Sequence, residues 1–264
     1  MRIVEIAVII LIVLAFGLLI TVAFSYIAPG TLIRPLGEFY LYATYNPYDP
    51  IVRLFTAMSP ESVTAIVWDF RGLDTLFETS VFYLAIIGAL ALTRGLMPAP
   101  KGEEGQGLSV IVKSVTKITV PMILAVGASV GLHGHLTPGG GFQGGSVIAV
   151  IPMLMIVIFS VLFLAKRMNI TGFLILRSIG LAIIGFTGVA LFIAGLVQGV
   201  PAWVFQNMPK PGAPLSMPVE VHGALISGTL WFFNLAEMIA VASGFSIAFL
   251  ILLLVKEVEF RGES

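Results

Sequence analysis

The sequence contains no cysteine, and few of its residues carry a charge. Without cysteine the chain cannot form disulfides, cysteine-ligated zinc sites, iron–sulfur clusters or a thiol nucleophile. Only 11% of the 264 residues are charged, whereas a soluble globular chain is typically about 25% charged. So little polar surface could not cover a water-soluble fold. The formal net charge of zero also gives no sign of a strongly basic or acidic partner such as nucleic acid.

Apolar residues are abundant instead, at 58% of the chain, and the mean hydropathy is +1.05. Several apolar runs reach the roughly 20 residues that a helix needs to cross the hydrocarbon core. The six runs cover residues 4–27, 75–97, 114–132, 145–165, 170–199 and 225–255. The first run is longer than the 7–15 apolar residues of a signal peptide. We therefore expect an all-α polytopic membrane protein with about six transmembrane helices.

Basic residues near the ends of the runs predict the orientation, because cytoplasmic loops carry an excess of Lys and Arg. If both termini are cytoplasmic, ten basic residues lie inside and four outside. The inside set is Arg2, Arg94, Lys101, Lys113, Lys117, Lys166, Arg167, Arg177, Lys256 and Arg261, and the outside set is Arg34, Arg53, Arg71 and Lys210. We expect Lys117 and Arg177 to reach the inner headgroups with their long side chains. The alternative is that each pairs with a buried acid.

A polar segment rich in Gly and Pro, residues 98–107, interrupts the apolar pattern. Its composition is typical of a linker. It predicts a first membrane module at residues 1–97, a cytoplasmic linker at 98–112 and a second membrane domain at 113–264.

The first module carries acidic residues just before and within its second apolar run. Thr75 and Glu78 have the spacing of a capping box, in which Glu78 accepts a hydrogen bond from the backbone at Thr75. Alternatively, Asp69, Arg71, Asp74 and Glu78 form a charged mouth at the outer edge. Glu78 would then pass protons or cations inward, since an ionisable residue inside a span suggests function. Asp69 and Asp74 could equally cap a helix or pair with Arg71.

A loop rich in glycine separates the third and fourth runs. Its notable residues are His133, His135, Pro138, Gly139, Gly140, Gly141, Gly144 and Gly145. A phosphate-binding loop would need a Lys and a Ser or Thr after the last glycine, and neither follows. Two His residues two positions apart diverge on a helix, so the pair gives little support to a metal site. The remaining interpretation is structural: the helix ends near Gly131–Gly134 and Pro138 prevents its continuation, the next three glycines permit positive φ, and the last two permit close helix packing.

Glu237 lies deep in the last run, and Asn234 lies three residues earlier on the same helix face. An unpaired carboxylate at that depth is costly, so we expect Glu237 to face protein or water, or to be protonated. Two roles remain open: Glu237 exchanges H⁺ or Na⁺ with its surroundings, or it joins subunits by hydrogen bonds.

Two motifs resemble parts of a known transport system. The run GLHGHLTPGGGFQGG resembles the signature of the B subunit (MrpB or MnhB) of Mrp-type multisubunit Na⁺/H⁺ antiporters, and the similarity extends over about residues 113–255. The run DFRGLDTLFETSVF resembles the MbhE-like segment found at the C-terminus of the large A subunit, over about residues 1–95. The chain departs from the antiporter pattern at Asn234, where an acidic residue is expected; Glu237 follows one turn later.

The resemblance implies a non-catalytic, multi-pass accessory subunit in the cell membrane. It would assemble with other Mrp-type subunits and with a redox module, as in archaeal membrane-bound hydrogenase and sulfane reductase complexes. The chain would hold no cofactor, and the complex would transport Na⁺ or H⁺. The ionisable and polar residues in or near the spans are the candidates for an ion path: Glu237, Asn234, Glu78, Asp74, Asp69 and Lys117. The alternative is a stand-alone small transporter, although the repeated halves common in such transporters are not evident.

Overall fold

The computed structural model describes residues 10–15, 17–19, 21–22, 33–93 and 107–262, and it separates into two units. The first unit, residues 1–42, contains short apolar helical segments between residues 10 and 22 and nearly all of helix α2 (Ile33–Ala43). The second unit, residues 43–264, contains all of the long helices. The boundary predicted at residues 98–112 falls mostly outside the described residues, so the predicted division into modules stays a prediction.

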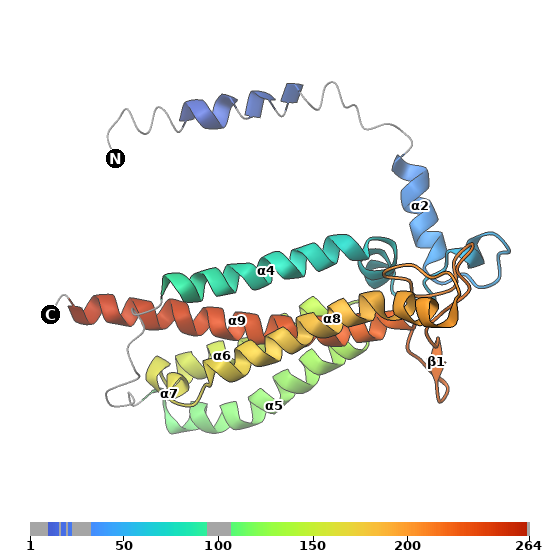
Figure 1. The fold of residues 1–264 in the computed structure, drawn as a ribbon. Coiled ribbons are helices and arrows are strands. Elements are labelled where there is room, and N and C mark those ends of the chain that lie inside the picture. The colour runs from blue at the N-terminus through green and yellow to red at the C-terminus, as the bar shows by residue number, and fades with distance from the viewer. Residues whose placement is uncertain (1–9, 16, 20, 23–32, 94–106, 263–264) are drawn as a thin grey trace. The chain divides into compact units, whose positions relative to one another are not determined.

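The second unit is a bundle of long apolar helices, drawn in Figure 1. Its helical elements are η1 (Val52–Leu54), α3 (Ser62–Thr64), the π-helix η2 (Ala65–Phe70), α4 (Gly72–Leu92), α5 (Val110–Leu132), α6 (Gly141–Ile158), α7 (Val161–Ala165), α8 (Ile170–Gln198) and α9 (Thr229–Gly262). Strands β1 (Glu220–Val221) and β2 (Ala224–Leu225) form one antiparallel hairpin. The fold is therefore all-α, as expected.

Five helices of the described residues are long and apolar enough to cross a membrane: α4, α5, α6, α8 and α9. They correspond to the second through sixth predicted spans. The first predicted span, residues 4–27, lies largely outside the described residues, which include only an apolar helical stretch at Ile10–Leu19 with a gap. The orientation with both termini in the cytoplasm stays a prediction.

Two of the predicted spans differ from the observed helices. The fourth begins earlier, at Gly141, and is divided because α6 ends at Ile158. The chain then starts α7 with Ser160 as its cap, whose hydroxyl accepts a hydrogen bond from Phe163 N at 3.0 Å. The last span begins at Thr229 and not at residue 225, because Leu225 pairs with Glu220 in the hairpin.

Helix α9 is the centre of the bundle and contacts α4, α5, α6, α7 and α8. In its apolar span 61% of the residues are buried, against 17% in α4 and in α5. Close helix approach depends on small residues, as in other membrane bundles. A Cβ at Gly180 of α8, for example, would lie 2.6 Å from the carbonyl oxygen of Ala236 on α9.

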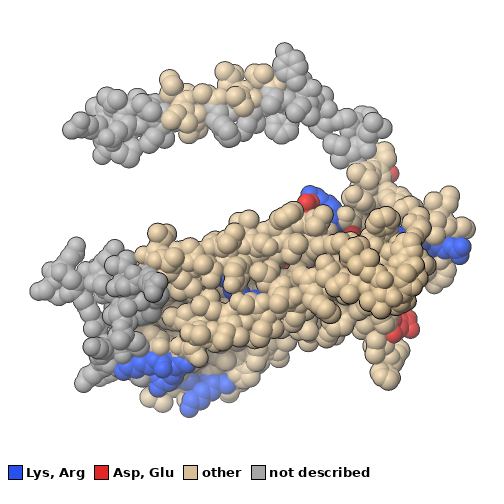
Figure 2. All heavy atoms as spheres, viewed as in Figure 1, with Lys and Arg blue, Asp and Glu red and all other residues tan. Residues whose placement is uncertain are grey.

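Three connections, residues 43–71, 133–140 and 199–228, meet beyond the N-terminal end of α4, and we call this region the loop end. Trp68 stacks on Phe233 with ring centroids 4.4 Å apart, and Phe205 stacks on the other side of Phe233 at 5.6 Å. Asn207 joins two connections, because its Nδ2 donates to Ala57 O at 2.9 Å. Figure 2 shows many of the Lys and Arg side chains near the opposite end of the bundle, where α5 begins and α7 lies.

Candidate functional site: an acidic cavity at the start of helix α6

The glycine loop turns the chain sharply between α5 and α6. Helix α5 ends at Leu132, and the carbonyl oxygen of His133 then accepts from Leu136 N at 2.8 Å and from Thr137 N at 3.0 Å. After Pro138, Gly139 and Gly140 have φ values of +148° and +144°, which residues with a Cβ rarely adopt.

Gly141 had been expected to share the positive φ of its two neighbours, and that expectation is wrong, because it is the first residue of α6. Its lack of a side chain matters for packing instead. A Cβ at Gly141 would collide with the carbonyl oxygen of Asn234 and would lie 2.7 Å from Glu237 Cβ. Gly141 therefore allows α6 to begin directly against α9.

The next two glycines bring α6 close to helices on two sides. A Cβ at Gly144 would lie 2.6 Å from Gly127 O on α5, and a Cβ at Gly145 would lie 2.7 Å from Met238 O on α9. Both neighbouring atoms belong to the backbone and cannot move aside alone. The first turn of α6 is thus fixed between α5 and α9.

The N-terminal end of α6 faces the two polar residues of α9. Gly141 N donates to Asn234 Oδ1 at 3.1 Å, and the Phe142 backbone N–H faces the Glu237 carboxylate. Because a backbone N–H can only donate, this bond fixes which amide atom of Asn234 points toward α6. The unpaired N–H groups and the dipole at a helix N-terminus favour negative charge. The glycine loop therefore positions a helix terminus that suits a carboxylate at Glu237.

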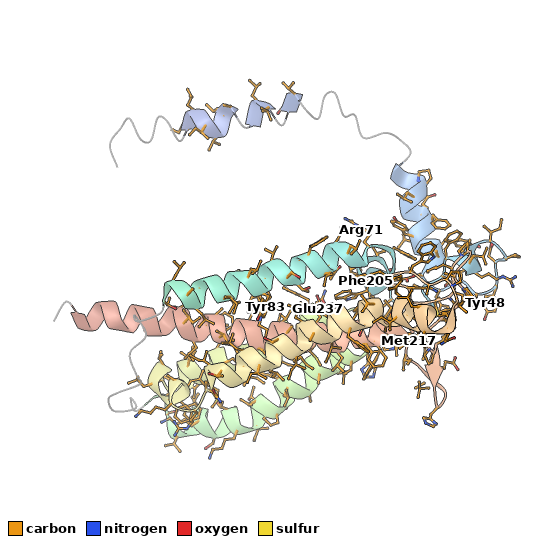
Figure 3. All side chains as sticks on the ribbon, in the orientation of Figure 1. Tyr48, Arg71, Tyr83, Phe205, Met217 and Glu237 are labelled. Atoms are coloured by element: carbon orange, nitrogen blue, oxygen red, sulfur yellow. The ribbon has the colours of Figure 1, made fainter. Side chains whose placement is uncertain are left out.

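Glu237 and Asn234 line a cavity of about 200 Å³ together with Glu78 of α4. Further lining residues come from the π-helix, the glycine loop and α6 and include Trp68, Gly140 and Gln143. Glu237 is 7% exposed and Asn234 is 1% exposed, whereas Glu78 is exposed on α4. Figure 3 shows Glu237 between α4 and α9. The structure thus brings together three of the six ion-path candidates.

Two buried donors at this cavity have no hydrogen-bond partner among the described residues: Asn234 Nδ2 and Trp68 Nε1. The Trp68 side chain faces the Glu237 carboxylate without meeting hydrogen-bond geometry. Buried polar groups are normally paired with protein or ordered water. The carboxylate oxygens of Glu237 and Glu78 are also ligands that hard cations prefer. The cavity is therefore suited to hold water, a proton or a small cation.

Glu78 does not cap a helix, and the capping-box interpretation is wrong. Helix α4 begins at Gly72, and its N-cap residue, Arg71, makes no side-chain cap. The hydroxyl of Thr75 donates to Val67 O at 2.5 Å, so the π-helix occupies the place of the expected cap.

Asp69 and Asp74 lie outside the lining of this cavity and have separate partners. Asp74 forms an exposed ion pair with Arg71, as expected. The pairing of Asp69 with Arg71 is wrong, since its buried carboxylate contacts Lys210 Nζ at 3.0 Å. Burial raises the pKa of Asp69, and the charge of Lys210 partly opposes that rise.

Lys117 and the two His residues also lie outside the lining of the cavity. Lys117 is exposed on α5. His133 is exposed, while His135 is buried with Nε2 2.9 Å from Leu225 O. No group of three or more His, Asp or Glu that could hold a metal ion occurs within the part of the chain that the structure describes.

Sequence reasoning missed Trp68 and Gln143, which line the cavity, and misplaced Arg177. Trp68 immediately precedes the run DFRGLDTLFETSVF, which begins at Asp69, and Gln143 lies inside the glycine motif, so one polar group adjoins a motif and the other lies within one. Arg177 was expected at the headgroups. It is instead 1% exposed, within the membrane-spanning part of α8.

Known proteins are similar to this chain in sequence and in fold. A family model described as a domain related to the MnhB subunit of Na⁺/H⁺ antiporter matches residues 111–247. The uncharacterized protein MJ1307 of Methanocaldococcus jannaschii is 31% identical in an alignment 116 residues long, and the match covers 38% of this chain and 44% of that protein. The chain therefore spans less than half the length of this relative.

A solved structure is similar over nearly the whole chain. It is a chain from the membrane-bound sulfane sulfur reductase, an archaeal respiratory membrane complex. The two chains are 26% identical with a TM-score of 0.63, and the match covers 95% of this chain and 98% of the other. The family model confirms the resemblance to the MnhB subunit over residues 111–247.

Proposed function

Because the chain belongs to the MnhB-related family of antiporter subunits, we propose that it is an accessory subunit of an Mrp-type cation/proton antiporter module. The module would belong to a membrane respiratory complex of the hydrogenase or sulfane reductase type, and the similar solved chain supports this assignment. Residues 1–95 would be the MbhE-like part of a fused subunit.

The acidic cavity supports a direct role in ion movement. Glu237 is buried within a membrane span, faces the N-terminal end of α6 and shares the cavity with Asn234 and Glu78. In this proposal Glu237 exchanges Na⁺ or H⁺, and Glu78, exposed on α4, passes the ion to or from a neighbouring subunit. The exposed surface of α4 and α5 would be covered by those subunits and by lipid.

The test is Glu237→Gln, because the amide keeps hydrogen bonding but cannot titrate or carry charge. We expect the purified complex to assemble at normal yield while coupled Na⁺ or H⁺ transport in proteoliposomes falls at least about tenfold, the size of one lost charged contact of roughly 1.4 kcal/mol. Glu220→Gln is the matched control, because Glu220 is exposed in β1. Transport at the wild-type rate in the Glu237 variant would leave this residue as a hydrogen bond between helices.

Purification in mild detergent tests the assembly itself. We expect larger antiporter-type membrane subunits to co-purify with the chain, identified by mass. Recovery of the chain alone, active in transport after reconstitution, would instead support a stand-alone small transporter.

A further inference from the structure

Arg177 is a buried cation within the membrane-spanning part of α8. Its Nη1 and Nη2 atoms are inaccessible to solvent and have no hydrogen-bond partner among the described residues. A guanidinium group offers five N–H donors and stays charged in proteins. Such a group inside a membrane is costly and commonly marks a functional position.

The surroundings of Arg177 hold its charge in a defined place. The Cζ atom lies 4.9 Å from the ring centroid of Phe82 and 4.8 Å from that of Tyr83, both on α4. On α9, Gly244 leaves room for the guanidinium, since a Cβ there would lie 3.4 Å from Cζ. A space of about 10 Å³, enough for roughly one water, adjoins Arg177 and is also lined by Thr79.

This space and the acidic cavity follow one another along the contact between α4 and α9. On α4, Glu78 lines the acidic cavity and Thr79 lines the space beside Arg177. On α9, Glu237 lies seven residues before Gly244, which is about 10 Å along a helix. Figure 3 shows Tyr83 and Glu237 along this contact.

Beyond Arg177 the contact between α4 and α9 is apolar. Ile86, Ile247 and Ile251 form a buried cluster there, with Phe82 packed against it. Arg177 therefore lies between the acidic cavity and this buried apolar cluster. Among the described residues that line the space beside it, none is acidic.

We propose that Arg177 sets the affinity of the acidic cavity for the transported cation. The proposal rests on the proposed function, in which Glu237 and Glu78 bind that cation. The fixed positive charge weakens cation binding at the two carboxylates, so that a bound cation can leave. Transport requires binding strong enough for entry and weak enough for release. At an effective dielectric of about 20, a unit charge about 10 Å away, the helical rise from Glu237 to Gly244, changes a binding constant by about tenfold.

The experiment compares Arg177→Met with Arg177→Lys in the assembled complex, reconstituted into proteoliposomes. The quantity measured is the concentration of Na⁺ that gives half-maximal transport, or the proton concentration if H⁺ is the transported ion. We expect Arg177→Met to lower this concentration by about tenfold and Arg177→Lys, which keeps the charge, to leave it within about twofold. Arg167→Met is the matched control, because Arg167 is exposed after α7 and should leave the value unchanged.

An unchanged or raised half-saturating concentration in assembled Arg177→Met would overturn the proposal. Failure of this variant to assemble would do so too, because a guanidinium with no hydrogen-bond partner should be replaceable by an apolar side chain of similar length. Glu237→Gln, measured in parallel, separates the two hypotheses. Normal transport in that variant rejects the proposed ion path, whereas impaired transport beside an unshifted Arg177→Met rejects only the role of Arg177.

Discussion

Gly141, the first residue of α6, lies against Glu237 of α9 so closely that a Cβ on the glycine would be 2.8 Å from the Glu237 carboxylate oxygen Oε2. The contact explains why a glycine loop precedes α6. It places the unpaired N–H groups of the helix terminus against the buried polar pair of α9, where they favour negative charge. The glycine loop and Glu237 are far apart in sequence but are in contact in the fold.

Gly141→Ala tests this contact. The added methyl group would collide with the backbone oxygen of Asn234 and with Glu237, so helix α6 or α9 must shift. We expect a loss of stability of about 1–3 kcal/mol, the usual cost of overpacking, together with a lower yield of complex. The measurement is the thermal unfolding midpoint of the purified complex.

Gly185→Ala is the matched control for that variant. Gly185 also lies in a membrane helix, but among the described residues no atom beyond its neighbours on the same helix lies within 4 Å of the position of its missing Cβ. Since alanine favours helices more than glycine does, this variant should unfold at an unchanged or slightly higher temperature. Equal behaviour of the two variants would contradict the packing role of Gly141.

Features that depend on local composition could be predicted from the sequence. The apolar runs gave five observed spans, and the glycines of residues 139–145 correctly indicated a sharp turn followed by close packing. The hydrophobic effect and the backbone freedom of glycine act locally, so a short segment carries their signal.

Features that depend on distant partners could not be predicted. Asp69 contacts Lys210, which lies 141 residues away, and no local sequence pattern predicts that pair. Arg177 was predicted to lie at the headgroups, but it is buried against other helices. Helix α8 is apolar on all sides, so its sequence does not indicate which face contacts protein. One local feature was also missed, because the π-helix before Gly72 supplies an acceptor for Thr75, only eight residues away, in place of the expected capping box.

Glu78→Gln should leave assembly intact, because Glu78 makes no helix cap and is exposed. We expect coupled transport to fall at least about tenfold, since the variant removes one of two carboxylates at the cavity. Asp74→Asn is the control, because Asp74 is exposed and pairs with Arg71 outside the cavity lining. If both variants transport ions at the wild-type rate, Glu78 has no part in the ion path.

The predicted orientation can be tested by labelling single cysteines in a chain that has none of its own. Ser216 is exposed at the loop end, and Lys166 is exposed after α7 at the other end of the bundle. In intact cells, an impermeant maleimide should label Ser216→Cys and should reach Lys166→Cys only after the membrane is opened. The reverse pattern would place the loop end in the cytoplasm and reject the predicted topology.

The two His residues of the glycine loop should differ in their effect on stability. Burial lowers the pKa of His135 below its ordinary value of 6.5, and the hydrogen bond to Leu225 O only partly opposes this. The folded protein then binds a proton less readily than the unfolded chain. The contribution of His135 to the free energy of unfolding is therefore complete above pH 6.5 and is lost as the pH falls from 6.5 through the lowered pKa.

His135→Gln keeps a donor for Leu225 O but cannot titrate, so its unfolding midpoint should lack this acid-side decrease. At neutral pH the free energy of unfolding of His135→Gln should be lower by about 1 kcal/mol, a typical cost of substitution at a buried position. His133→Gln is the matched control, because it removes an exposed imidazole and should retain the acid-side decrease. Thermal unfolding of the complex between pH 5 and 8 measures both variants, and an undiminished acid-side decrease in His135→Gln would assign the pH dependence to other groups.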